Sequence, residues 1–88
     1  MTKSDRNTPI EGGETTIGDF GWALSAMRRG EKVQRTGWNG KGMYIDLQVP
    51  GEYSKMTLPY IFMSTAQGDL VPWLCSQTDM LADDWQIF

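Results

Sequence analysis

A glycine-rich run of six residues, Gly37-Trp38-Asn39-Gly40-Lys41-Gly42, separates two apolar segments near the middle of the chain. Glycine permits a positive φ and a close approach of the backbone to a ligand. Between two strand-like segments, such a run predicts a tight reversal of the chain. The other side chains supply a stacking surface, an amide and a cation, which together can hold a base and a phosphate. The run is therefore either a hairpin turn with one aromatic anchor or a ligand-binding loop.

The sequence on either side of this run predicts a small antiparallel sheet. Apolar and polar side chains alternate over residues 43–49, which indicates a half-buried strand. Residues 57–65 are apolar on both faces, so this strand is either central in the sheet or covered by another subunit. Short connections favour antiparallel pairing. The predicted strands cover residues 32–36, 43–49, 57–65, 70–71 and 85–88.

Two capping patterns predict helices. Thr16 and Asp19 form a variant of the capping box, and an apolar stripe that starts at Phe20 then predicts a helix over residues 17–29. Trp22 lies outside this stripe. It is interpreted as a contact with another subunit, as part of the wall of a ligand site, or as a partly covered surface side chain. Ser76 and Asp79 form a second box that predicts a helical turn over residues 77–82. The predicted fold is α+β, a small antiparallel sheet with one N-terminal helix and a short second helix.

Composition limits how such a chain reaches stability. With 88 residues there is room for one domain, which we assign to residues 17–88 after a flexible N-terminal tail over residues 1–16. Cys75 is the single cysteine and histidine is absent, so an internal disulfide is excluded and a metal cluster is disfavoured. Four tryptophans, three tyrosines and three phenylalanines favour a homo-oligomer, because aromatic side chains are enriched where surfaces meet.

The same composition argues against several functions. A net charge of −3 without a basic patch disfavours a nucleic-acid polymer as partner. Without histidine the commonest general base is missing, and Cys75 has no imidazole partner. The adjacent Asp83 and Asp84 are interpreted as a solvated loop. We therefore expect a protein that is not an enzyme and needs no cofactor or metal. The lone thiol and the lack of an apolar signal or spanning segment predict a cytoplasmic protein without membrane contact.

A second aromatic-polar segment, residues 71–79, strengthens the binding interpretation. Trp73 precedes a predicted helix N-terminus, where free amides attract anions and where Ser76, Gln77 and Thr78 form the cap. Asp79 can accept hydrogen bonds from ribose hydroxyls. Together the two segments suit a nucleotide-like ligand. The alternative is that Trp38 and Trp73 belong to the core and the second segment is only a cap.

The ordered set of segments 20–24, 37–45, 59–61, 69–73 and 76–85 resembles a small phage and prophage domain, the type-two Thoeris anti-defence proteins. The resemblance covers about residues 18 to 88. It implies a homotetramer that binds glycocyclic ADP-ribose, the signal made by TIR-domain defence proteins, and withholds it without cleaving it. Some members also bind cyclic dinucleotides at a separate site. The implied location is the cytoplasm of an infected bacterial host.

The resemblance and the side-chain chemistry together suggest ligand-binding residues. Trp38 and Trp73 are the predicted adenine-stacking surfaces, and Asn39 is predicted to bond a base edge or a phosphate. The pyrophosphate is predicted to contact Lys41, Ser76, Gln77 and Thr78. A ribose hydroxyl is predicted to donate a hydrogen bond to Asp79. Phe20 is a weaker candidate for ligand binding, because its place in the apolar stripe predicts that it belongs to the core. The alternative function is a protein-interaction module that inhibits a host defence protein directly through Trp22 and the surface of residues 60–62. A nucleotide hydrolase is a third possibility.

Overall fold

The computed structural model describes residues 17–88. The predicted flexible tail, residues 1–16, lies outside the described residues. Within them, the elements in chain order are β1 (Ile17–Gly18), α1 (Phe20–Arg28), β2 (Val33–Arg35), β3 (Tyr44–Gln48), β4 (Tyr60–Ser64), β5 (Leu70–Pro72), α2 (Gln77–Met80) and β6 (Trp85–Ile87).

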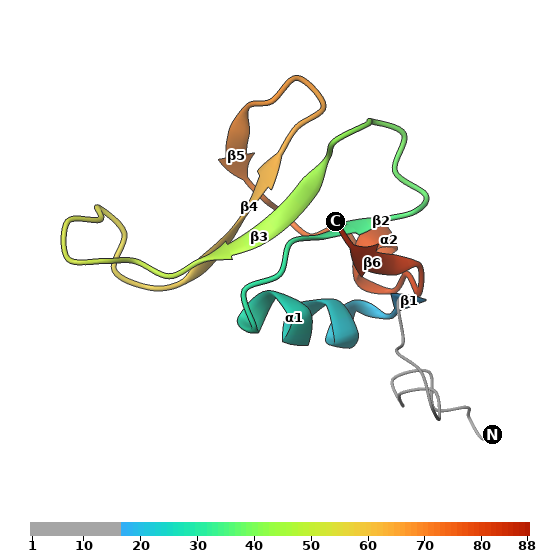
Figure 1. Ribbon diagram of the computed structural model, residues 1–88, viewed down its shortest axis with the longest axis horizontal. Helices are drawn as coiled ribbons and strands as arrows, with labels where there is room; N and C mark the ends of the chain where they lie inside the picture. Colours follow the sequence, from blue (N-terminus) through green and yellow to red (C-terminus); the bar gives the residue numbers. More distant parts are fainter. Residues whose placement is uncertain (1–16) are drawn as a thin grey trace.

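The strands form one six-stranded antiparallel sheet in the order β1-β6-β2-β3-β4-β5 (Figure 1). The predicted α+β class, with an antiparallel sheet and two helices, is confirmed. β4 lies between β3 and β5, so the first of the two alternatives for residues 57–65, a strand inside the sheet, is confirmed. β1 was not predicted, because two residues are too few for any alternation to appear.

The first helix starts later than the capping pattern predicted. Ile17 and Gly18 pair with Gln86 and Trp85 of β6, so the backbone there is extended and cannot be helical. Asp19 is instead the N-cap, and its Oδ1 accepts a hydrogen bond of 3.0 Å from the Trp22 amide. The predicted helix start at residue 17 is therefore wrong, and Asp19 is the N-cap itself and not the fourth residue of a capping box. Thr16, the other member of the predicted box, lies outside the described residues.

The core lies where α1 packs against β2, β3 and β6. Its buried members are Ala23, Ala26, Met27, Val33, Ile45 and Trp85. Phe20, Trp22 and Leu24 are half-buried against this cluster, so the predicted stripe and the Trp22 flank both contact the core. Trp22 also covers Gly18, where an added Cβ would lie 2.5 Å from the Trp22 Cγ.

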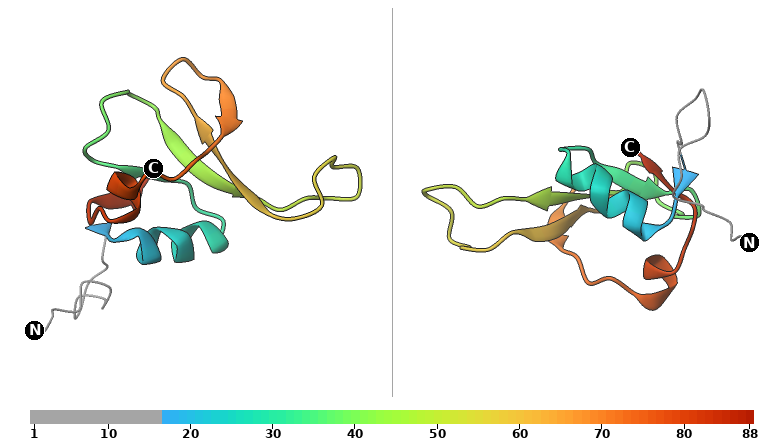
Figure 2. Two further views of the ribbon diagram at one scale, coloured as in Figure 1. Left: turned by 180° about the vertical axis from the view of Figure 1, so that it is seen from behind. Right: turned by 90° about the horizontal axis from the view of Figure 1, so that it is seen from below.

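The β3–β4 hairpin extends beyond this core. Figures 1 and 2 show its connecting loop projecting away from α1, and residues 49–58 are almost all exposed. Pro72 pairs with Phe62 as the last residue of β5, on the outer edge of the sheet. An edge strand tolerates proline because the missing N–H faces away from the ladder. Among residues 17–88, no helix is long and apolar enough to cross a membrane.

Candidate functional site

The glycine-rich run forms a loop that borders an open hollow of about 470 Å³. Gly42 has a φ of +76°, and a Cβ on Gly40 would lie 2.5 Å from the Met43 sulfur and 2.9 Å from the Ala66 Cβ. Glycine is thus required at both positions. The predicted ligand residues Trp38, Asn39 and Lys41 all line the hollow. Its other lining residues are Gln34, Arg35, Thr36, Gly40, Gly42, Met43 and Gln86.

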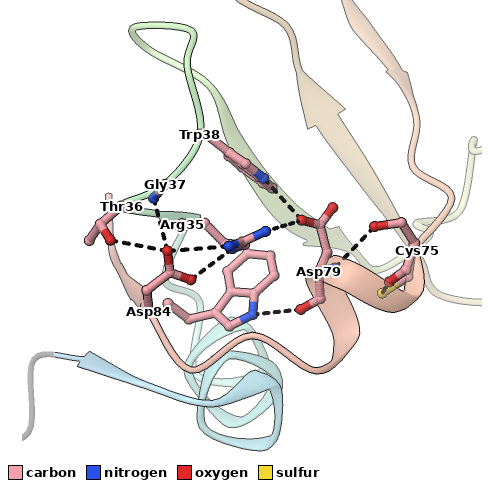
Figure 3. Close-up of polar contacts among 9 residues, drawn as sticks. Arg35, Thr36, Gly37, Trp38, Cys75, Asp79 and Asp84 are labelled. Atoms are coloured by element: carbon pink, nitrogen blue, oxygen red, sulfur yellow. Dashed lines mark hydrogen bonds and ion pairs between the residues drawn. The ribbon is translucent and has the colours of Figure 1, made fainter.

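Arg35, at the end of β2, pairs with two carboxylates (Figure 3). Its Nε donates to Asp84 Oδ1 at 2.7 Å and its Nη1 donates to Asp79 Oδ1 at 2.8 Å. These three side chains are largely covered, with exposed fractions of 18% for Arg35, 16% for Asp79 and 27% for Asp84. We call this group the Arg35 clamp.

The electrostatics of the clamp favour its charged form. The hydrogen bond from Arg35, more than those from Gly37 and Thr36, holds the pKa of Asp84 below its ordinary value. The bonds to Asp84 and then Asp79 raise the pKa of Arg35. Burial, aided by the negative charge of Asp79, raises the pKa of the nearby Cys75 thiol. At neutral pH the Cys75 thiol therefore stays protonated.

Both carboxylates of the clamp also hold the start of the glycine-rich loop. Asp84 Oδ2 accepts hydrogen bonds from the Gly37 amide at 2.9 Å and the Thr36 hydroxyl at 3.1 Å. Asp79 Oδ1 accepts one from the Trp38 indole Nε1 at 3.2 Å (Figure 3). The interpretation of Asp83 and Asp84 as a solvated loop was wrong for Asp84, because its carboxylate is engaged by β2 and the loop.

The predicted stacking residues pack on one buried ring. Trp85 contacts Trp38 edge-on at 5.3 Å and Trp73 edge-on at 6.2 Å between ring centroids. Phe20 lies 5.5 Å from Trp85 and 5.9 Å from Trp73, which agrees with the prediction that it belongs first to the core. Trp38 and Trp73 are half-buried, so each is in part a core residue. Trp38 lines the hollow, whereas Trp73 does not.

The second predicted segment is present as a cap on a very short helix. Ser76 Oγ accepts from the Asp79 amide at 3.0 Å, as the capping pattern predicted. The helix ends at Met80 instead of residue 82, and a single turn has too small a dipole to attract an anion by itself. The side chains of Ser76, Gln77 and Thr78 are exposed outside the hollow. Asp79 alone links this segment to Trp38.

Sequence reasoning missed four residues of the site: Gln34, Arg35, Asp84 and Gln86. Gln86 Nε2 donates to Gln34 Oε1 at 3.2 Å, and Gln34 Nε2 donates to the Met43 carbonyl at 3.3 Å. The pairing of β2 with β6 places Gln34 opposite Gln86 and Arg35 opposite Trp85. These partners are about fifty positions apart in the chain, so local patterns carry no signal for them.

A second hollow, of about 660 Å³, lies on the extended part of the sheet. We call it the apolar groove. It is lined by Gln48, Met56, Thr57, Leu58, Pro59, Tyr60, Phe62, Leu70, Val71 and Pro72. Several of these are exposed to an unusual degree, including Leu58 at 74% and Leu70 at 65%. No cluster of three or more potential metal ligands occurs within residues 17–88.

Comparison with known proteins assigns this set of features to a family. The model of the Thoeris anti-defense 2-like domain matches residues 18–88. The chain belongs to this family. A protein named Thoeris anti-defense 2, from Bacillus phage SP01, is 38% identical over 81 aligned residues, covering 77% of this chain and 91% of the phage protein.

Membership of the Thoeris anti-defense 2-like family confirms the resemblance drawn from the sequence and gives the chain an anti-defence role. The matched region spans both helices, the glycine-rich loop and the whole Arg35 clamp. The site described above therefore lies within the part of the chain that defines the family.

Proposed function

We propose that the chain is a sponge that binds a cyclic nucleotide immune signal and withholds it without cleaving it. The proposed ligand is glycocyclic ADP-ribose made by TIR-domain proteins, with cyclic dinucleotides as a second class. The observation that carries the proposal is that Trp38, Asn39 and Lys41 line one open hollow. Their loop is held in place by hydrogen bonds from Gly37 and Trp38 to the carboxylates of Asp84 and Asp79. An anti-defence family supplies the biological setting, and the proposed location is the cytoplasm of the infected host.

The loop side chains suit the parts of such a ligand. The half-exposed face of Trp38 can stack on a purine, and base–aromatic stacking contributes on the order of 1–3 kcal/mol. Asn39 can both donate to and accept from a base edge. Lys41 is exposed and brings a positive charge for the phosphates. Gln34 and Gln86 add two amides, hydrogen-bonded to each other, to the lining of the hollow.

The second segment contributes to the proposed site from its outer side. Trp73 and Trp38 both contact the ring of Trp85 edge-on. Asp79, in the turn of α2, accepts a hydrogen bond from the Trp38 indole. The exposed Ser76, Gln77 and Thr78 extend the polar surface beyond Trp38, where they are proposed to meet the pyrophosphate. Hydroxyl and amide donors, and not the dipole of a one-turn helix, carry that part of the proposal.

Binding without cleavage agrees with the chemistry of these side chains. The chain has no histidine to serve as a general base. The raised pKa of Cys75 makes its thiol a poor nucleophile, and the lowered pKa of Asp84 makes it a poor proton donor. A sponge instead needs slow release, which buried stacking and paired phosphates provide.

We also propose that the sponge is a homotetramer. The apolar groove exposes large apolar side chains of β4 and β5, whereas the buried core lies between α1 and strands β6, β2 and β3. A domain of this size gains stability when such surface is buried by another subunit.

Native mass spectrometry of the purified protein with glycocyclic ADP-ribose, other cyclic ADP-ribose isomers and cyclic dinucleotides tests the proposal. The expected result is a tetramer that carries intact ligand, with unchanged ligand recovered after heat denaturation. Recovery of a cleaved product would instead identify a nucleotide hydrolase.

The apolar groove also favours a second candidate, a protein-interaction module that inhibits a host defence protein directly. The Tyr60–Phe62 surface lies at this groove, but Trp22 is half-buried against the core and offers less contact surface than the sequence suggested. An oligomer that ignores the whole ligand panel but co-purifies with a host protein would support this candidate.

A further inference from the structure

Asp79 occupies a position between the body of the protein and the Trp38 ring. Its Oδ1 accepts from Arg35 Nη1 at 2.8 Å and from Trp38 Nε1 at 3.2 Å (Figure 3). Its main chain is fixed as well, because its amide donates to Ser76 Oγ and its carbonyl accepts from Trp85 Nε1 at 3.0 Å. An oxygen held on both sides in this way has little freedom to rearrange.

The Trp38 amide donates to the Arg35 carbonyl at 3.2 Å, but this backbone bond does not set the orientation of the indole ring. Trp38 follows Gly37 and lies in a loop rich in glycine, whose backbone costs more entropy to order than that of any other residue. The indole N–H bond to Asp79 and the edge contact with Trp85 fix the plane of the ring. A ring that is fixed before the ligand arrives loses less freedom on binding.

We propose that Asp79 is a positioning residue, which fixes the Trp38 indole for stacking while Arg35 and Asp84 hold the Asp79 carboxylate and the loop backbone in place. This role rests on the proposed function and replaces the direct ribose contact that the sequence predicted for Asp79. Arg35 is essential to it, because Arg35 is the cation that compensates both carboxylates of the clamp at this covered position.

A double-mutant cycle separates positioning from direct contact. Asp79→Ala is made in the natural protein and in Trp38→Phe, which keeps an aromatic ring but has no N–H to donate. The dissociation constant for glycocyclic ADP-ribose is measured by calorimetry in all four proteins. We expect Asp79→Ala to weaken binding by on the order of tenfold in the natural protein, and by less than about twofold in the Trp38→Phe background. An equal loss in both backgrounds would show a direct contact and overturn the proposal.

A second readout needs no ligand. The Trp38 indole N–H resonance in a ¹⁵N-labelled protein, assigned by its loss in Trp38→Phe, reports the bond to Asp79. In Asp79→Ala this resonance is expected to move upfield and to exchange faster with D₂O, while the amide resonances of β3 and β4 stay in place. A Trp38 resonance that does not change would overturn the proposal. Asp69→Ala, an exposed carboxylate on the β4–β5 turn, is the matched control and should change neither readout.

The two experiments keep the two proposals apart. If no cyclic nucleotide binds the natural protein, the proposed function fails and the indole resonance alone decides whether Asp79 positions Trp38. If the ligand binds but the cycle is additive, the function stands and the positioning role fails. Should Asp79→Ala not fold, Asp79→Leu, which keeps the branched shape of the side chain but has no acceptor atom for the Trp38 indole, replaces it in both experiments.

Discussion

Arg35 joins parts of the chain that are far apart in sequence. Its partners Asp79 and Asp84 lie 44 and 49 positions away, yet each forms a hydrogen bond shorter than 3 Å with the guanidinium. Charge-assisted bonds of this kind are about twice as strong as neutral ones. At the residue scale, this one side chain connects the end of β2, the turn of α2 and the residue that precedes β6.

The clamp makes stability depend on pH in the acid range. The pKa of Asp84 is lowered in the folded state, mainly by Arg35. Its ion pair therefore stabilises the protein fully above the unfolded pKa, about 4, and this contribution is lost as the pH falls through the folded pKa. We expect the difference in unfolding free energy between the natural protein and Asp84→Asn to be constant above about pH 5 and to shrink below about pH 4.

Urea denaturation at a series of pH values measures this difference. Asp69→Asn serves as the control, because Asp69 is exposed on the β4–β5 turn and is not a member of the clamp. Asp79 faces the same guanidinium, so the Asp84→Asn protein retains one carboxylate for Arg35. A gap that stays constant down to the lowest pH would mean that the Asp84 charge does not contribute to folding.

At the scale of elements, α2 depends on its surroundings more than on its own length. A helix of one turn cannot persist alone in water. Here its N-terminus is capped by Ser76, its Asp79 carbonyl accepts from Trp85 Nε1, and the Asp79 side chain bonds to Arg35. These contacts hold α2, and with it Asp79, in a fixed position, although the helix is too short to act as an anion site.

Loss of the Ser76 cap should destabilise α2 and make the position of Asp79 less fixed. Ser76→Ala is expected to lower the unfolding free energy by about 1 kcal/mol, because the Asp79 amide loses its acceptor. In a domain of this size that corresponds to a drop in Tm of roughly 4–8 °C, measured by circular dichroism. The Trp38 indole N–H should also exchange faster. Thr78→Ala, at an exposed position of the same turn, is the control. Equal Tm values for the two variants would contradict the capping role.

At the scale of the whole molecule, the core and the exposed apolar surface lie on different parts of the sheet. The buried residues gather where α1 meets β2, β3 and β6, whereas the apolar groove is lined by residues of β3, β4, β5 and the β3–β4 loop. Figure 1 shows how these elements are arranged. A large apolar surface that the protein's own chain leaves uncovered is typical of a contact with another protein.

The proposed homotetramer predicts that a charge in the groove disrupts assembly. Leu58→Glu should leave the circular dichroism spectrum intact, because Leu58 is 74% exposed in the single chain. It should convert the tetramer into smaller species in native mass spectrometry, since a buried unpaired charge is costly. Gln67→Glu adds the same charge on the β4–β5 turn outside the groove and should not alter the mass. An unchanged mass for Leu58→Glu would place any subunit contact elsewhere.

Much of the fold could be predicted, because it follows from local regularities. Alternating side chains marked β3, and Pro and Gly marked the ends of strands. The Ser76 cap was found from two residues three positions apart. The errors occurred where pairing across the sheet competes with a local pattern. Residues 17 and 18 fit a helix start, yet their hydrogen bonds to β6 draw them into a strand.

For the site, the sequence by itself predicted a glycine-rich loop that carries Trp38, Asn39 and Lys41, because a turn depends on neighbouring residues. It also identified the family, since the ordered segments are retained along the chain. Only the tertiary structure decided that Arg35 and Asp84 hold this loop, that Trp38 and Trp73 share Trp85, and that Asp79 bonds to the Trp38 indole. Apart from the contact between Trp73 and Trp85, these contacts join residues more than forty positions apart, and they arise only when β6 returns to pair with β2.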